Sequence, residues 1–334
     1  MEPRFVVAGL LRRDYLLPPV GLPLLDAPGG NLLYAAGGLR TWESDIGLLG
    51  RVGEDYPFQW LRDFEARGFD TQGLKIIPSS LDLRNFLSYS ETFELSRTNP
   101  VSHFARRGLN FPKSLLGYQP PPDMSKRPRQ LHPHAPTVSQ IPPKYLDVSA
   151  VHLCPMDFTT HGQLLTAFKA GLTTTVTLDP EPAYMTPDFL RDLRELLNGL
   201  TAFLPSEEEL RSLFWGKTND LWEMAEALGD YGCELVVIKQ GGQGQMLYDA
   251  MGKHRWEIPA YPSRMADPTG AGDAFCGGFL AGYRESYEPL DAALYGNVSA
   301  SLTVEGSGPF YPLEVMPGLA QARLEALRDL VREV

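Results

Sequence analysis

The amino-acid sequence predicts an α/β protein with a mainly parallel central sheet that helices cover on both faces. Short apolar runs rich in β-branched residues recur along the 334 residues, as expected for strands buried on both sides. Segments with helical periodicity lie between these runs. Strands that alternate with helices favour parallel pairing. A content of 43% hydrophobic and 10% aromatic residues is enough to bury a large core.

The predicted strands are brief and almost entirely apolar. They occupy residues 5–10, 45–49, 150–153, 173–178, 202–204 and 235–238. The predicted helices occupy residues 187–197, 221–228 and 319–331. In the first of these helices, Thr186 stands at the capping position and Pro187 at the first helical position, where proline is favoured.

Two regions depart from this alternation. Residues 81–104 interleave polar and apolar side chains, which predicts antiparallel strands with one face in water and therefore a small separate sheet. Residues 105–143 hold nine of the 29 prolines of the chain. Because proline lacks an amide donor and restricts its neighbours, we expect this second region to be an irregular insertion.

Composition argues against several classes of protein. The formal net charge of -11 disfavours binding to nucleic acid or to an anionic membrane surface. Three widely spaced cysteines form neither a disulfide framework nor a zinc pattern, so reduced thiols are expected. No run approaches the roughly 18 to 20 apolar residues of a membrane span, and the first residues do not resemble a signal peptide. A soluble cytoplasmic protein is expected.

The segment 266–283 carries the clearest chemical signal. Gly270, Ala271 and Gly272 precede Asp273 and an apolar pattern of helical period. Free amides at the start of such a helix form an anion site. A carboxylate beside a bound phosphate is repelled unless it accepts a proton from an attacking hydroxyl, which predicts Asp273 as a general base. The alternative is an ordinary helix start, where aspartate is also favoured.

Two other phosphate motifs fail. Residues 216–218 read GKT, but Arg211 stands where the P-loop requires a glycine. The dinucleotide pattern GxGxxG fails because Phe275 occupies its third glycine position, which argues against an oxidoreductase.

The segment resembles the carboxy-terminal signature of the ribokinase-like (PfkB) carbohydrate kinase family, DTxGAGD followed by an aromatic residue. It shares Asp267, Thr269, Phe275 and the run 270–273, with Pro268 where threonine is common. Residues 28–58 resemble the amino-terminal signature of the same family, a GG pair before an alanine-rich helix and GRVGxD.

The resemblance implies a single three-layer α/β/α ribokinase-like domain over residues 1–334, with eight or nine strands and a small β-sheet lid from about 14–22 and 81–104. It implies transfer of the γ-phosphoryl group of ATP to an alcohol of a sugar, polyol or related molecule. It also implies magnesium, an optional potassium ion and a possible homodimer formed through the lid. A nucleoside kinase and a non-catalytic sugar- or nucleotide-binding relative are the alternatives.

The resemblance assigns roles to further residues. The substrate-binding residues would be Asp14, Gly29, Gly30, Asn31, Tyr34 and Arg84, although family members commonly carry asparagine where Tyr34 stands. The nucleotide-binding residues would be Lys239, Gly241, Gly244 and Asn297.

Glu209 would help to organise magnesium. The local sequence Ser206–Glu209 also fits a capping box, in which the serine and glutamate satisfy amides at a helix start. The two interpretations of Glu209 are equally supported by the sequence.

Overall fold

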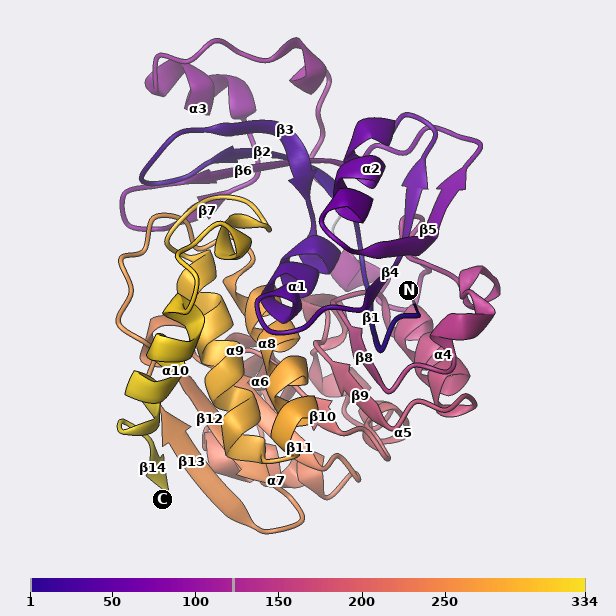
Figure 1. Cartoon of the computed structure of the whole chain (residues 1–334), viewed down its shortest axis with the longest axis vertical. Helices are drawn as coiled ribbons and strands as arrows, with labels where there is room; N and C mark the ends of the chain where they lie inside the picture. The colour runs from indigo at the N-terminus through magenta and orange to yellow at the C-terminus, as the bar shows by residue number, and fades with distance from the viewer. Residues whose placement is uncertain (1, 122–123, 334) are drawn as a thin grey trace.

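The computed structural model describes residues 2–121 and 124–333, and within them the main domain is built on a ten-stranded sheet (Figure 1). The order is β14-β13-β12-β11-β10-β9-β8-β1-β4-β5. The strands from β11 to β5 pair in parallel, and β12, β13 and β14 are antiparallel. The bounds are β1 (Phe5–Ala8), β4 (Ile46–Gly53), β5 (Asp70–Ile77), β8 (Ala150–Leu153), β9 (Thr175–Leu178), β10 (Ala202–Phe203), β11 (Leu235–Lys239), β12 (Gln245–Asp249), β13 (His254–Ile258) and β14 (Arg332–Glu333).

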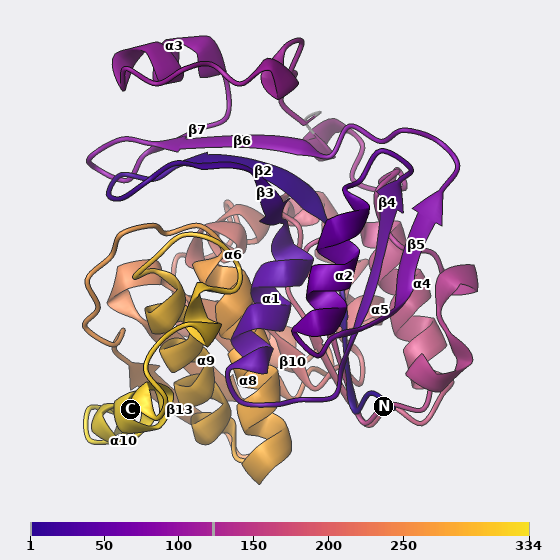
Figure 2. The same ribbon diagram turned by 45° about the horizontal axis from the view of Figure 1, so that its top comes forward.

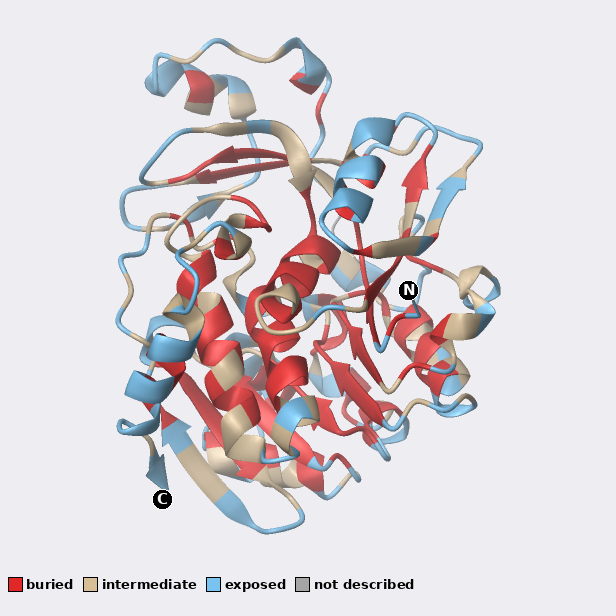
Figure 3. Cartoon of the chain, in the orientation of Figure 1, coloured by how far each residue is buried: buried red, intermediate tan, exposed pale blue. Residues whose placement is uncertain are grey.

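Helices cover both faces of this sheet, as the sequence predicts. One face is covered by α1 (Asn31–Arg40), α2 (Phe58–Ala66), α8 (Ala271–Ser286), α9 (Pro289–Thr303) and α10 (Leu319–Arg328). The other is covered by α4 (Phe158–Lys169), α5 (Leu193–Leu197), α6 (Glu207–Leu213) and α7 (Leu221–Gly229). Alternate residues of β11 enter opposite cores, Val237 on the first face and Val236 on the second. Figure 3 shows the sheet and its facing helices buried throughout the centre.

Helices α1 and α8 pack with their backbones in close contact. A Cβ atom at Gly277 of α8 would lie 1.9 Å from the carbonyl oxygen of Ala35 in α1, so only glycine allows this approach. The packing brings the amino-terminal ends of both helices to the same edge of the sheet, where the site described below is located.

A second, four-stranded sheet of order β3-β2-β6-β7 forms a lid over this edge (Figure 2). Its strands are β2 (Arg12–Leu17), β3 (Leu24–Gly29), β6 (Arg84–Tyr89) and β7 (Leu95–Ser96). The sequence analysis did not predict β3. The antiparallel pairing predicted within 81–104 is confirmed for β6 and β7, and β2 and β3 are also antiparallel. The central pair of β2 and β6, which joins segments far apart in the chain, is parallel.

The outer face of the lid packs against residues 100–118, which we call the lid cover. Helix α3 (Pro100–Arg106) belongs to it, so the prediction of strand throughout 81–104 is wrong at its end. Pro100 stands at the first helical position, where its fixed φ favours a helix. Phe86 of the sheet packs against Phe104 and Tyr118 of the cover, with ring centroids 6.1 and 6.3 Å apart.

Residues 105–143 contain little regular structure beyond the end of α3 and short 3₁₀ turns. These turns are η1 (Lys113–Leu115), η2 (Met124–Lys126) and η3 (Val138–Gln140), while η4 (Pro143–Tyr145) begins at the end of the region. Residues 122–123 of the predicted insertion lie outside the described residues.

The predicted helix 187–197 is interrupted. It divides into η6 (Pro187–Phe189) and α5, and the side chain of Thr186 makes no capping hydrogen bond. None of the helices described is long and apolar enough to cross a membrane. The three cysteines are buried free thiols.

Candidate active site

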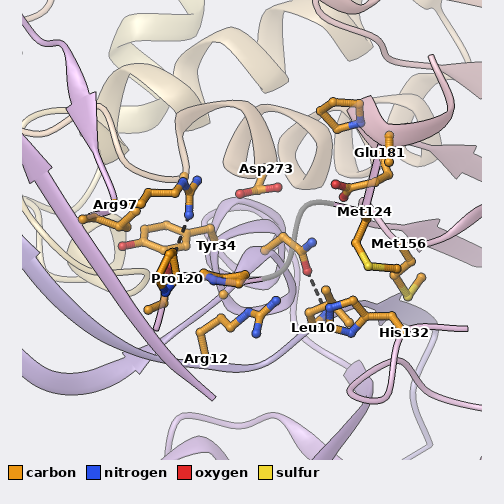
Figure 4. A pocket seen from close by; sticks show the side chains of 18 of the residues that line it. Leu10, Arg12, Tyr34, Arg97, Pro120, Met124, His132, Met156, Glu181 and Asp273 are labelled. Carbon is orange, nitrogen blue, oxygen red and sulfur yellow. Dashed lines mark hydrogen bonds between the residues drawn. The ribbon is translucent and has the colours of Figure 1, made fainter. Parts of the chain in front are cut away.

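A cavity of about 560 Å³ lies between the lid and the carboxyl edge of the main sheet. The lid, the first turns of α1 and α8, the loop after β9 and the predicted insertion all contribute to its wall. Figure 4 shows side chains from these segments converging on one space. This is the edge at which open α/β sheets bind ligands.

The first turn of α8 forms a site suited to an anion. Gly270 has a left-handed φ of 73°, and a Cβ atom there would lie 2.0 Å from the ring of Tyr34. In the parts of the chain described, the amides of Gly272 and Asp273 have no backbone acceptor outside the helix. These amides and the positive end of the helix dipole provide donors for a phosphate group.

Asp273 is half-buried and lines the cavity. Burial, reinforced by repulsion from Asp179, raises the pKa of Asp273 to about 7. Figure 4 shows its carboxylate directed into the cavity. A carboxylate with a pKa near neutrality is suited to accept a proton from an alcohol.

Asp14 faces the same cavity from β2 of the lid. It accepts a hydrogen bond from Asn85 Nδ2 at 2.9 Å. Burial raises the pKa of Asp14 to about 6, although Asn85 and Arg12 oppose the rise. A Cβ atom at Gly29 would lie 1.8 Å from the Asp14 carboxylate, so this predicted glycine is required by close contact.

Asn31 and Tyr34 both line the cavity from α1. Asn31 Oδ1 accepts a hydrogen bond from the Leu10 amide at 2.7 Å, and its Nδ2 donates to the Pro155 carbonyl at 2.8 Å. The Asn31 side chain therefore fixes the start of α1 against two loops. The buried hydroxyl of Tyr34 has no hydrogen-bond partner among the described groups.

Lys239 ends β11 beside the first turn of α8, because a Cβ atom at Gly272 would lie 3.6 Å from its Nζ. Its Nζ lies 2.6 Å from Asp179 Oδ2 and 3.7 Å from Cys276 Sγ. Burial lowers the pKa of Lys239, but Asp179, Cys276 and Glu209 together outweigh this effect and raise it. The ammonium group is therefore held at the edge of the anion site.

Glu209 forms the capping box. The Ser206 side chain accepts from the Glu209 amide at 3.2 Å, and Glu209 Oε2 accepts from the Ser206 amide at 2.7 Å. Burial and the nearby Asp179 raise the pKa of Glu209 to about 7. Across residues 2–121 and 124–333, no group of three or more His, Cys, Asp or Glu residues is arranged to hold a metal. The predicted role toward magnesium stays a prediction.

The other predicted nucleotide-binding residues lie after β11 and on α9. Gly241 begins η7 (Gly241–Gln243) and Gly244 follows it, with positive φ angles of 57° and 101°. The Asn297 side chain is engaged inside the protein: its Nδ2 donates to Pro259 and Gln245, and its Oδ1 accepts from the Tyr261 amide. Asn297 therefore supports the loop after β13 with its side chain.

The placement of Arg84 in the substrate site is wrong. On β6, Asn85 lines the cavity, so alternation turns Arg84 to the outer face of the lid. There its guanidinium lies 2.7 Å from Asp82 and donates to the carbonyls of Ser114 and Leu116 in the lid cover.

The sequence analysis missed several residues of the cavity wall. Arg12 precedes Asp14 by two positions on the same strand, and this spacing could have placed both on one face. Glu181 follows β9 at the carboxyl edge, which was also a usable signal. Arg97 and the insertion residues Met124 and His132 carried no signal that the sequence analysis used, and His132 was left unassigned.

A comparison with models of protein families identifies the family to which the chain belongs. Residues 122–316, more than half of the chain, match the model of the pfkB family carbohydrate kinases. A cytidine kinase of Thermococcus kodakarensis is 29% identical over 288 residues, which cover 86% of this chain and 90% of the relative. An ATP-dependent ribose-1-phosphate kinase of Halopiger xanaduensis is 25% identical over 281 residues, covering 84% and 81%.

Solved structures show the same fold. A putative ribokinase II from E. coli superposes with a TM-score of 0.72 at 17% identity, covering 97% of this chain and 99% of that chain. A nucleoside kinase of Burkholderia thailandensis in complex with inosine gives a TM-score of 0.69 at 18% identity, covering 97% and 98%. The predicted ribokinase-like fold class is confirmed.

Proposed function

Because this chain belongs to the pfkB family of carbohydrate kinases, we propose that it transfers the γ-phosphoryl group of ATP to an alcohol with Asp273 as the general base. The alcohol belongs to a sugar, a polyol or a related small molecule. The observation that carries the proposal is the position of Asp273, which faces the cavity from the helix turn whose amides form the anion site.

In the proposed reaction, the acceptor hydroxyl gives its proton to the Asp273 carboxylate while its oxygen attacks the γ-phosphorus. A new P–O bond forms, the bond from the γ-phosphorus to the bridging oxygen breaks, and ADP leaves with that oxygen. The amides of Gly272 and Asp273 donate to the transferring oxygens, and the Lys239 ammonium lies close to them.

The nucleotide would lie along η7 and the start of α8, with backbone contacts from Gly241 and Gly244. Magnesium, when bound, neutralises charge on the nucleotide phosphates. The described residues lack a dedicated cluster of ligands, which fits an ion held mainly by phosphates and water, with Glu209 within the same region. A potassium requirement stays a prediction that turnover with and without potassium would test.

The acceptor would bind between Asp14 and Asp273. The Asp14 carboxylate can accept hydrogen bonds from hydroxyl groups. Gly29 makes room for this carboxylate, and Gly30 lines the cavity. Asn31 acts here by fixing the start of α1, in addition to any contact with the ligand.

A nucleoside kinase is the second candidate, and the sequence similarity to a cytidine kinase favours it. A non-catalytic binding protein is the third. We expect a cytoplasmic protein with no nucleic-acid or membrane partner. If a homodimer forms through the lid, the second copy would contact the edge strands β3 and β7, because the lid cover already occupies the outer face of the lid sheet.

The test is ADP release from ATP and magnesium across sugars, polyols, sugar acids and nucleosides. The Asp273→Asn variant should lose about 10²- to 10⁴-fold in turnover, as expected for loss of a general base, and should still bind ATP. An exposed aspartate replaced in the same way, Asp63→Asn, is the control. Turnover by Asp273→Asn at the parent rate would contradict the mechanism, and a parent without turnover would favour a binding protein.

A further inference from the structure

The lid side of the cavity carries two arginines without a carboxylate partner. Arg12 Nη1 lies 3.0 Å from His134 Nδ1, and Arg97 Nη1 donates to Asn85 Oδ1 at 3.1 Å. Figure 4 shows both side chains reaching into the cavity, which they line. Neither takes part in an ion pair with any carboxylate that the structure describes.

Several buried or half-buried arginines elsewhere in the described chain form ion pairs. Arg13 pairs with Asp26 at 2.8 Å, Arg84 with Asp82 at 2.7 Å, and Arg323 with Glu305 at 2.7 Å. A guanidinium removed from water without a counter-charge is unfavourable. Arg12 is half-buried and Arg97 is exposed, and the half-buried Arg51 and Arg284 also lack an ion pair among the described residues. What sets Arg12 and Arg97 apart is that both line the cavity.

The polar partners of these two arginines do not supply a negative charge. Burial and the proximity of Arg12 lower the pKa of His134 to about 3, so its imidazole is neutral and accepts from Arg12. Asn85 is a neutral amide. Arg12 and Arg97 also oppose each other, and burial lowers the pKa of Arg12. An anion placed between them would relieve both effects.

Charged groups of both signs lie near Arg12 and near Asp273. The charged groups that most influence Arg12 are Asp14 and Arg97 on the lid, followed by Glu181. Those that influence Asp273 are Asp179, Lys239 and Glu181 on the main domain. Among the described residues that line the cavity, Arg12 and Arg97 are the cationic side chains that can bind a negative group on a ligand outside the anion site of α8.

We infer that the acceptor carries an anionic group, a phosphate or a carboxylate, which Arg12 binds together with Arg97 while Asp273 deprotonates a hydroxyl at the other end of the molecule. This inference rests on the proposed kinase function and narrows its substrate class. The guanidinium fork of arginine matches both anions. A cavity of about 560 Å³ is large enough for a charged monosaccharide.

The kinetic test compares matched neutral and anionic acceptors: ribose with ribose 1-phosphate, and glucose with gluconate, with cytidine as a neutral nucleoside. We expect higher kcat/KM for the anionic member of a pair, and the preferred pair tells phosphate from carboxylate. Arg12→Met should lower kcat/KM for that compound by about 10- to 100-fold through KM, as expected for charge-assisted hydrogen bonds, and leave KM for ATP unchanged. Arg97→Met should act in the same direction.

Arg84→Met is the matched control, because it removes an arginine from the same lid that points to the outer face. Folding of each variant is checked by circular dichroism. If Arg12→Met does not fold, Arg12→Lys replaces it in the assays, because lysine keeps the positive charge but lacks the forked guanidinium group. The inference is overturned if a neutral compound is preferred, or if Arg12→Met changes only KM for ATP.

Calorimetric titration without ATP separates this inference from the kinase proposal. Binding of ribose 1-phosphate or gluconate to the parent, lost in Arg12→Met and weakened by salt, would support the anion site even if no acceptor were turned over. Turnover of neutral acceptors without binding of either anion would support the proposed kinase function and refute the anion site at Arg12. Absence of both binding and turnover would also refute it.

Discussion

Replacing Asp273 by asparagine should stabilise the folded protein in a manner that depends on pH. The pKa of Asp273 rises from an ordinary 3.8 to about 7 in the folded state, because the carboxylate is buried and lies near Asp179. The unfolded chain loses this proton near pH 4, whereas the folded chain retains it until pH 7. The parent therefore loses stability as the pH rises between these values, and the asparagine variant does not.

The rise in the pKa of Asp273 sets an upper limit to the stability that the asparagine variant can gain. A rise from 3.8 to about 7 corresponds to roughly 4 kcal/mol at one pKa unit per 1.36 kcal/mol. The loss of a negative charge in the first turn of α8 subtracts about 0.3 to 1 kcal/mol, because that charge interacts favourably with the helix dipole. The variant should therefore gain about 3 to 4 kcal/mol at most above pH 7 and little near pH 4.

Urea unfolding of parent and variant at intervals from pH 4 to pH 8 measures this difference directly. The gap between the two free energies of unfolding should open as the pH rises and stop changing above pH 7. Asp63→Asn provides the baseline for an exposed carboxylate. A gap that is constant with pH, or that closes as the pH rises, would refute the reasoning. In the parent, kcat/KM should fall as the pH is lowered through about 7, because protonated Asp273 cannot accept a proton.

Three further substitutions test the structure around the site. Gly270→Ala should lower the melting temperature and reduce turnover at least tenfold, because it places a Cβ atom against Tyr34 at a left-handed φ. Partial recovery of turnover in the Tyr34→Ala background would identify this clash as the cause. Unchanged kinetics in Gly270→Ala would contradict the prediction. Ser206→Ala should remove about 1 kcal/mol of stability in urea unfolding by breaking the capping box with Glu209. Phe104→Ala should remove about 3 to 5 kcal/mol from the lid, seen as faster amide exchange in β2 and β6, whereas unchanged exchange would mean that the lid cover does not support the lid.

The main sheet and the α8 loop could be predicted because their signals are local. A strand buried on both faces reads as a continuous apolar run, whichever neighbour it pairs with. The loop before Asp273 combines glycines, an aspartate and a helical pattern within a few residues. Both features follow from short segments of sequence.

The lid was predicted less well because its properties depend on register and on distant partners. A shift of one position moves a strand side chain to the opposite face, and this separates Arg84 on the outer face from Asn85 in the cavity. The parallel pairing of β2 with β6 joins residues 71 positions apart, such as Asp14 and Asn85. The role of Arg97 depends on tertiary packing for which the sequence has no local pattern.

The lid cover belongs to a continuous segment of chain that links the lid to the insertion side of the cavity wall. The chain that leaves β6 supplies Arg97, then the cover, then the part of the cavity wall that includes Met124 and His132. His134, at the end of this path, returns to contact Arg12 on β2. To exchange acceptor preference between relatives, residues 84–134 would therefore have to be transferred together with β2. A shorter transfer would separate Arg12 and Arg97 from the residues that orient them.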